Sequence, residues 1–177
     1  ISYIDAPIDS LLWSSLDAVC DSQESCDYIT IPHNSNLANG RMAPYRRIAD
    51  TLEARRGYAA KRLQREPIME IFQHKGASEC INGLSSVFGA PDELCEIESV
   101  RTIGIEEVYP VFSEEAGVQS VNQVSEITEE CSPGAVGSYG MFGAGCVHPT
   151  DYQRSALLVG LKERDQIGLN PIKLGVI

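Results

Sequence analysis

Two of the three histidines closely follow runs of β-forming residues. His33 comes after residues 28–32, and His74 comes just after residues 68–72. In α/β proteins ligands bind outside the carboxyl ends of parallel strands, so we expect both imidazoles at one sheet edge, facing one cleft. Imidazole is the commonest metal ligand in proteins and exchanges protons near neutral pH. The positions predict a metal or acid–base site, with a hydrogen-bonded structural role as the alternative for each histidine.

Charged residues accompany the second histidine. Glu70 lies four residues before His74, and the alternation of side chains along a strand places both on one face. We therefore expect His33 and Glu70 to be metal ligands and His74 to face the substrate. Lys75 follows, where an ammonium group can pair with a developing oxyanion, although a loop lysine is more often a solvated charge. These residues alone are too few for a closed metal site.

The loop after His33 is dense in amide, hydroxyl and guanidinium groups, contributed by Asn34, Ser35, Asn36, Asn39 and Arg41. Such a loop can orient metal ligands and bind an anionic oxygen, whereas asparagine also serves ordinary turns. We assign substrate contact to Asn34, Asn36 and Arg41, and also to Glu79. The chain has no phosphate-binding loop or dinucleotide glycine fingerprint, and Ser35 lacks the glycines of a nucleophile elbow.

The elements that must position these residues alternate between helix and strand. Helical spacing of apolar residues and turn signals predict helices over residues 7–20, 51–65 and 150–168. Runs rich in β-forming residues predict strands over residues 28–31, 68–72 and 172–177. Strand, helix and strand with a long crossover is the pattern of a parallel sheet, so the predicted fold class is α/β.

The cysteines fall into three neighbouring pairs, Cys20 with Cys26, Cys80 with Cys95, and Cys131 with Cys146. Sequence does not fix the connectivity, but short local loops are the simplest choice. Helical and strand periodicity also fails over residues 77–147, which predicts an irregular insertion stapled by disulfides. Disulfides imply an oxidising compartment, periplasmic or secreted. The alternative is a set of buried free thiols in a cytosolic protein.

Composition excludes some classes of partner. The net charge of −11 repels phosphate backbones, which argues against nucleic acid as a partner. No apolar run approaches the roughly 20 residues that span a bilayer. The chain starts at Ile1 without a leader and closes on residues that resemble a strand. We therefore expect residues 1–177 to be an internal fragment of one domain in a larger protein.

Three segments carry a resemblance to a known family. They are residues 31–42, residues 65–70, and residues 73–76 extended through Ser78 and Glu79. They resemble domain-of-unknown-function family 3604, and residues 151–161 extend the likeness beyond the insertion. That family is similar to the PHP (polymerase and histidinol phosphatase) superfamily of metal-dependent phosphoesterases.

The resemblance implies a partial distorted (β/α) barrel, interrupted by a long cysteine-rich insertion. It also implies two or three divalent ions, of zinc, manganese or iron, and hydrolysis of a phosphate-type or related ester of a small anionic molecule. His33 matches an intermediate metal ligand of that superfamily, and Glu70 and His74 follow the family's own pattern. The superfamily's early His-x-His pair would lie before Ile1, and its late Asp-x-His beyond Ile177.

Two functions of different class follow. The first is a metal-dependent hydrolase, in which the ions activate water and polarise the ester. The second is a metal-free, disulfide-stapled binding module on a degenerate barrel, and a metal-free enzyme with His74 as general base is a third idea. Intact His-x-His and Asp-x-His flanks would favour the hydrolase. Because ligands are few, residues 1–177 expressed alone are expected to bind metal weakly and to be inactive.

Overall fold

The computed structural model describes residues 1–2, 4–21, 25–41, 51–85, 90–103, 126–128, 130–132, 146–173 and 175–177. The α-helices are α1 (Asp9–Asp21), α2 (Leu52–Arg65) and α3 (Gln153–Ile167). Short 3-10 helices are η1 (Ser35–Leu37), η2 (Glu93–Glu96) and η4 (Pro149–Asp151). The strands are β1 (Ile68–Met69), β2 (Phe72–Gln73), β3 (Gly76–Ala77), β4 (Arg101–Ile103), β5 (Glu126–Thr128) and β6 (Gly175–Val176).

The parallel arrangement of segments that we expected around His33 and Glu70 is present, but the paired segments are short. β1 pairs in parallel with β6. On the other flank of β1, the Thr30 N–H donates to the carbonyl of Arg65 at 2.7 Å, and the Glu70 N–H donates to the carbonyl of Pro32 at 3.3 Å. Residues 28–32 therefore run beside β1 in its direction, although they form no regular strand. In the described part of the chain each sheet has two strands, and no closed barrel is formed.

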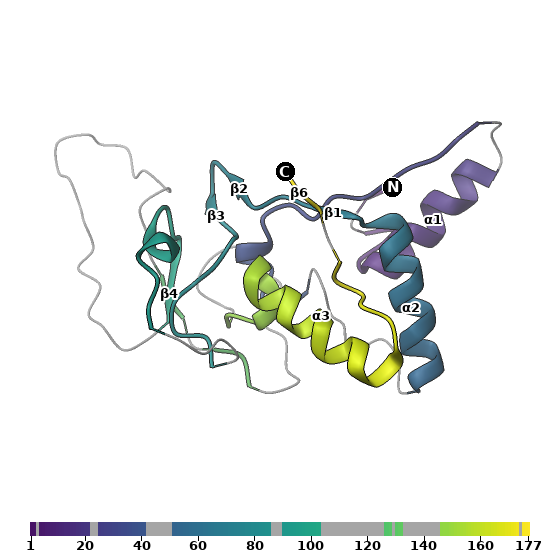
Figure 1. Ribbon diagram of the computed structural model, residues 1–177. Coiled ribbons are helices and arrows are strands. Elements are labelled where there is room, and N and C mark those ends of the chain that lie inside the picture. The colour runs from purple at the N-terminus through teal and green to yellow at the C-terminus, as the bar shows by residue number, and fades with distance from the viewer. Residues whose placement is uncertain are drawn as a thin grey trace, which may run out of the picture.

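The predicted strand over residues 68–72 is wrong in its second half. β1 ends at Met69, the Ile71 N–H still donates to the carbonyl of Ile177, and β2 then pairs antiparallel with β3 in a tight hairpin (Figure 1). Gly76 has a φ of 93°, a value that suits glycine, at the point where the chain reverses. The hairpin turn itself consists of His74 and Lys75. His74 consequently lies at a hairpin tip and not at the end of a parallel strand.

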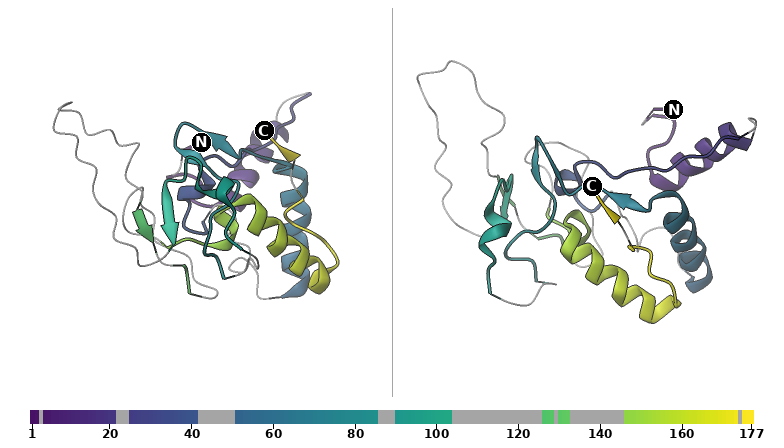
Figure 2. Two further views of the ribbon diagram at one scale, coloured as in Figure 1. Left: turned by 60° about the vertical axis from the view of Figure 1, so that its left-hand side comes forward. Right: turned by 45° about the horizontal axis from the view of Figure 1, so that its top comes forward.

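The three predicted helices are confirmed, with small shifts at their ends. Thr51 caps α2 by accepting the N–H of Ala54 at 3.2 Å. α3 starts at Gln153, after η4, and ends at Gly168, whose φ of 74° is typical of a helix terminus. Figures 1 and 2 show α2 and α3 together below the β1–β6 pair. These two helices are joined at Arg55, which forms an ion pair with the buried Glu163 of α3.

α1 is fixed to the rest of the fold by an aromatic contact. Trp13 is 1% exposed and packs against Tyr58 of α2, with 5.5 Å between ring centroids. Its indole N–H donates to the hydroxyl of Thr30 at 3.1 Å. Trp13 thereby links α1, α2 and the run that leads to His33.

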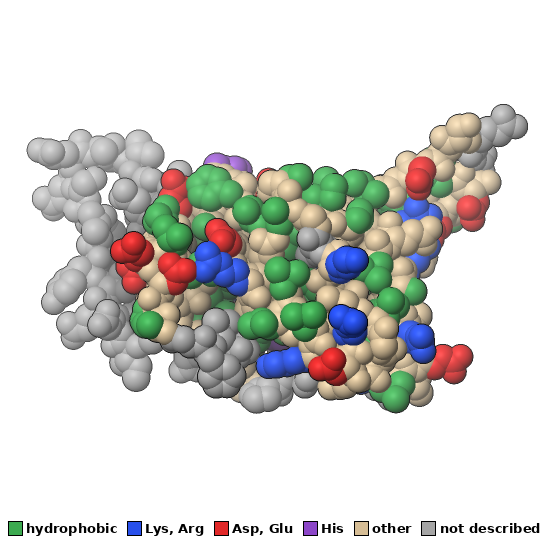
Figure 3. All heavy atoms as spheres, viewed as in Figure 1, with side chains coloured by type: hydrophobic (Ala, Val, Ile, Leu, Met, Phe, Trp, Pro, Cys, Tyr) green, Lys and Arg blue, Asp and Glu red, His purple; other side chains and the backbone are tan. Residues whose placement is uncertain are grey.

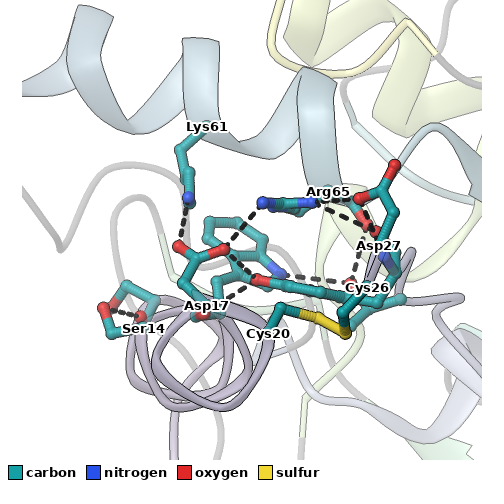
Figure 4. Close-up of polar contacts among 11 residues, drawn as sticks. Ser14, Asp17, Cys20, Cys26, Asp27, Lys61 and Arg65 are labelled. Atoms are coloured by element: carbon teal, nitrogen blue, oxygen red, sulfur yellow. Dashed lines mark hydrogen bonds and ion pairs between the residues drawn. A yellow bond between two sulfur atoms is a disulfide. The ribbon is translucent and has the colours of Figure 1, made fainter. Parts of the chain in front are cut away.

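A charged network closes the same interface (Figure 4). Asp17 of α1 pairs with Lys61 and with Arg65 of α2, the latter at 2.8 Å. Arg65 also contacts Asp27 at 2.8 Å and lies over the ring of Tyr28. The residues of this network, like Trp13, hold residues 27–30 against α2.

All three predicted disulfides are confirmed. Cys20 bonds to Cys26, Cys80 to Cys95 and Cys131 to Cys146, with Cα–Cα distances of 5.0, 5.1 and 4.8 Å. The last two lie in residues 77–147, where η2 and the parallel pair β4–β5 also form. Three disulfides are compatible with an extracellular or secreted protein. Among the described helices, none has the length and apolar character that a membrane crossing requires.

The buried carboxyl group of Glu66 makes stability depend on pH. Burial raises its pKa to about 7, against the opposing effect of Arg62. An unfolded glutamate has a pKa near 4.3, so between about pH 4 and 7 the folded state binds the extra proton and stability falls as pH rises. We expect a lower melting temperature at pH 8 than at pH 5. Asp151, whose pKa burial also raises to about 7, adds an effect of the same sign.

The measurement is thermal unfolding at several pH values between 5 and 8. Glu66→Gln should show a smaller fall in melting temperature than the wild type across this range, because its side chain does not titrate. Glu53→Gln, at an exposed position of the same helix, is the matched control and should keep the full fall. A Glu66→Gln protein that also kept the full fall would contradict the assignment.

Candidate functional site

The two predicted metal ligands are brought together. Nδ1 of His33 lies in direct contact with Oε2 of Glu70. The backbone hydrogen bond between Glu70 and Pro32 places His33 and Glu70 at the ends of two adjacent parallel segments. The His33 side chain is 54% exposed and that of Glu70 is 24% exposed, so the pair opens to the surface. The predicted convergence of His33 and Glu70 is therefore confirmed.

This contact defines how the imidazole can act. In the neutral tautomer that carries its proton on Nδ1, the ring donates to the Glu70 carboxylate, and Nε2 keeps the lone pair that can bind a ligand. Histidines that bind metals very commonly donate their other ring N–H to a carboxylate in this way. The contact thus makes His33 a candidate metal ligand through Nε2 and Glu70 a candidate orienting partner, and the role of Glu70 as a direct ligand stays a prediction.

His74 and Lys75 form the tip of the β2–β3 hairpin. His74 is exposed, and the Lys75 backbone N–H donates to the side chain of Gln73 at 3.0 Å. In the part of the chain that the structure describes, no hydrogen bond or ion pair connects the side chains of His74 or Lys75 with His33 or Glu70. The two predicted substrate-facing residues belong to a neighbouring hairpin rather than to the histidine–carboxylate pair itself.

Asn36 joins the loop after His33 to this hairpin. Its side chain is completely buried, and Nδ2 donates to the carbonyls of Lys75 at 3.0 Å and Ala77 at 3.4 Å. Its backbone N–H donates to the hydroxyl of Ser78 at 3.2 Å. These contacts give Asn36 a structural role in joining the loop to the hairpin, and its contact with substrate stays a prediction. Asn34 starts η1 in the left-handed conformation, with φ 58°, which asparagine tolerates well.

Glu79, another predicted substrate contact, is engaged by a surface arginine. Its carboxylate accepts hydrogen bonds from Nε and Nη2 of Arg154 at 3.0 and 2.7 Å. Arg154 also donates to Asp92 at 2.7 Å. The charge of Glu79 is thus matched within the fold. Arg41 lies half-buried at the end of the described loop.

The edge that carries the His33–Glu70 pair is also rich in exposed apolar residues. Ile31, Phe72 and Ile177 are 42%, 52% and 62% exposed. Figure 3 shows hydrophobic side chains gathered along the upper edge of the molecule, where Figure 1 places β1, β2 and β6. The pair therefore stands on apolar surface, although the chain as a whole carries a net charge of −11.

Sequence reasoning missed a buried polar cluster behind the loop. It comprises Asn39, Gly40, Arg101, His148 and Asp151, all of which except His148 are buried. Burial raises the pKa of Asp151 to about 7, while backbone N–H groups and Arg101 oppose the rise. The cluster joins residues more than a hundred positions apart, so no local spacing could reveal it.

The described residues do not by themselves form a complete metal site. Among them, no group of three or more His, Cys, Asp or Glu side chains is placed to hold an ion. His33 and Glu70 form a pair with the chemistry of a metal ligand and its carboxylate partner. The residues present thus fit a divalent ion only in combination with further ligands.

The described structure combines helices with short two-stranded sheets, and it places a histidine–carboxylate pair at the ends of two adjacent parallel segments. A family model described as "Protein of unknown function (DUF3604)" matches residues 1–120, which include His33, Glu70 and His74. The chain belongs to this family. No curated protein and no solved structure matches it.

Proposed function

We propose that the chain is part of a metal-dependent, phosphoesterase-like hydrolase of small anionic esters, exported to the periplasm or outside the cell. The observation that carries the proposal is the contact between His33 and Glu70. Metal-binding histidines commonly contact a carboxylate through the ring nitrogen that does not bind the metal. The resemblance to the PHP superfamily supports the same chemistry. The three disulfides support the location.

Each residue then has a defined role. His33 contributes Nε2 as a ligand, and Glu70 holds the ring and increases its basicity. A divalent ion of zinc, manganese or iron, when bound, supplies Lewis-acid polarisation and an activated water. His74 and Lys75, at the exposed hairpin tip, supply a proton carrier and a positive charge on the substrate side.

The remaining ligands are proposed to come from the early His-x-His and late Asp-x-His motifs that the resemblance places outside residues 1–177. The described residues offer no group of three ligands, so additional ones are required for tight binding. The small number of candidate ligands among the described residues also favours the alternative function, a disulfide-stapled binding module without metal.

A metal-dependence assay on the full-length protein separates these functions. The protein is stripped with a chelator, reloaded separately with zinc, manganese and iron(II), and assayed on p-nitrophenyl phosphate, bis(p-nitrophenyl) phosphate and p-nitrophenyl acetate. We expect hydrolysis of at least one phosphate ester that disappears on stripping and returns on reloading. Hydrolysis unaffected by stripping would support the metal-free enzyme. A protein that retains no metal and hydrolyses nothing would support the binding module.

A further inference from the structure

The turn formed by Asn39 and Gly40, soon after His33, is held by a buried guanidinium group and a buried carboxyl group. Arg101, the first residue of β4, is 2% exposed and donates from Nη2 to Oδ1 of Asn39 at 2.6 Å. Asp151 in η4 is completely buried and accepts the backbone N–H of Gly40 at 2.6 Å. Its other oxygen accepts the N–H of His148 at 3.0 Å.

Burying these two ionisable side chains costs more free energy than burying apolar side chains of similar size. A buried charge destabilises a fold unless hydrogen bonds or an opposite charge compensate it. Arg101 and Asp151, both described, are not in direct ion-pair contact, and each instead contacts the turn. Asn39 and Gly40 have φ values of 53° and 77°, so two successive left-handed residues are held in place. A Cβ added to Gly40 would lie 2.8 Å from Cγ of His148, so the turn packs closely against that side chain.

The segment that carries Arg101 also contacts the hairpin. The Ala77 N–H donates to the carbonyl of Glu98 at 3.0 Å, and a Cβ on Gly76 would lie 2.3 Å from that same oxygen. The Cys80–Cys95 disulfide ties this segment to the chain that follows the hairpin. Residues 98–101, inside the cysteine-rich insertion, thus contact both the loop after His33 and the hairpin that carries His74.

We propose that Arg101 is a positioning residue for the candidate site. Arg101 fixes the loop that follows His33 by its hydrogen bond to Asn39. Residues 98–101 of the cysteine-rich insertion thereby contribute to the geometry of the site. The catalytic consequence rests on the proposed function, whereas the effect on the loop does not. Arg101 acts through Asn39 and is not assigned contact with a substrate.

The test combines hydrogen exchange with kinetics on the full-length protein. The variants are Arg101→Met, Arg101→Lys and Asn39→Gly, and the last keeps a left-handed backbone while removing the acceptor oxygen. Arg55→Met is the matched control, because it removes a guanidinium with a buried carboxylate partner at the α2–α3 contact. Deuterium uptake is followed by mass spectrometry in a peptide covering residues 31–41. Hydrolysis is measured on the best phosphate ester found for the wild type.

In Arg101→Met and Asn39→Gly we expect residues 31–41 to exchange about tenfold faster or more, the size that suits loss of a hydrogen bond from a charged donor. The kcat should fall by about tenfold or more, with partial recovery in Arg101→Lys and no change in Arg55→Met. If Arg101→Met does not fold, Asn39→Gly decides the matter.

Four results would count against parts of this account. Wild-type exchange in both Arg101→Met and Asn39→Gly, or equal acceleration in Arg55→Met, would overturn the positioning role. Faster exchange with an unchanged kcat would overturn its importance for catalysis. A wild-type protein that hydrolyses no ester would instead refute the proposed function, and exchange would still decide whether Arg101 holds the loop.

Discussion

Replacing His33 by alanine in the full-length protein is expected to remove bound metal and hydrolysis together. The imidazole is the candidate ligand, and its contact with Glu70 aligns it for that role. Changes at partners that only orient a ligand cost about 10- to 100-fold in metal affinity or activity, and loss of the ligand itself should cost at least as much. The measurements are metal content by mass spectrometry and kcat/KM on the phosphate ester.

Two further variants sharpen this prediction. Glu70→Gln should fall within the smaller range of about 10- to 100-fold, because it keeps a side chain of the same shape but loses the carboxylate charge. His74→Ala should keep its metal and lose activity only, since His74 lies on the hairpin and not in the pair. Because the His33 side chain is 54% exposed, none of the loss should come from unfolding. Full metal and activity in His33→Ala would make His33 merely structural.

Truncation of Trp13 is expected to have the largest effect on stability. The side chain is 1% exposed, packs on Tyr58 and donates to Thr30. Trp→Ala changes in protein cores typically cost about 3–5 kcal/mol, so the free energy of unfolding should fall by about that amount. Urea unfolding with the disulfides intact measures it. Because Thr30 precedes His33 by three residues, the variant should also loosen the run that carries the candidate ligand.

Trp13→Phe is the matched variant. It keeps an aromatic ring against Tyr58 but loses the indole donor and part of the volume, so its cost should be clearly smaller than that of Trp13→Ala. Leu11→Ala, at an exposed position of the same helix, should cost little. A loss below about 1 kcal/mol for Trp13→Ala, well under the usual core range, would show that α1 is not fixed through this residue.

Local sequence signals predicted much of the framework. Apolar spacing predicted α1, because helical periodicity depends only on near neighbours. Start and stop signals, namely capping-box spacing and the proline at position 67, predicted α2. The three cysteine pairs followed from proximity along the chain. The contact of His33 with Glu70 followed from the general rule that parallel strands end at one edge, which applies even where, as here, the pairing is short.

Other features depended on contacts that no local pattern records. The hairpin turn at His74 breaks a β-rich run that reads as one strand, and Gly76 alone did not reveal the reversal. Asn36 was predicted to contact substrate because its chemistry suits that role, and its burial against the hairpin is a tertiary property that no local pattern records. The Arg101–Asn39 contact spans 62 positions and was outside the reach of spacing arguments.

The most direct test of the central claim is a crystal structure of the metal-loaded full-length protein, with diffraction measured on both sides of the absorption edge of the bound metal. The account predicts an anomalous peak directly bonded to Nε2 of His33, with Nδ1 still held by Glu70. A metal peak elsewhere, with Nε2 of His33 in contact only with water or protein, would contradict it.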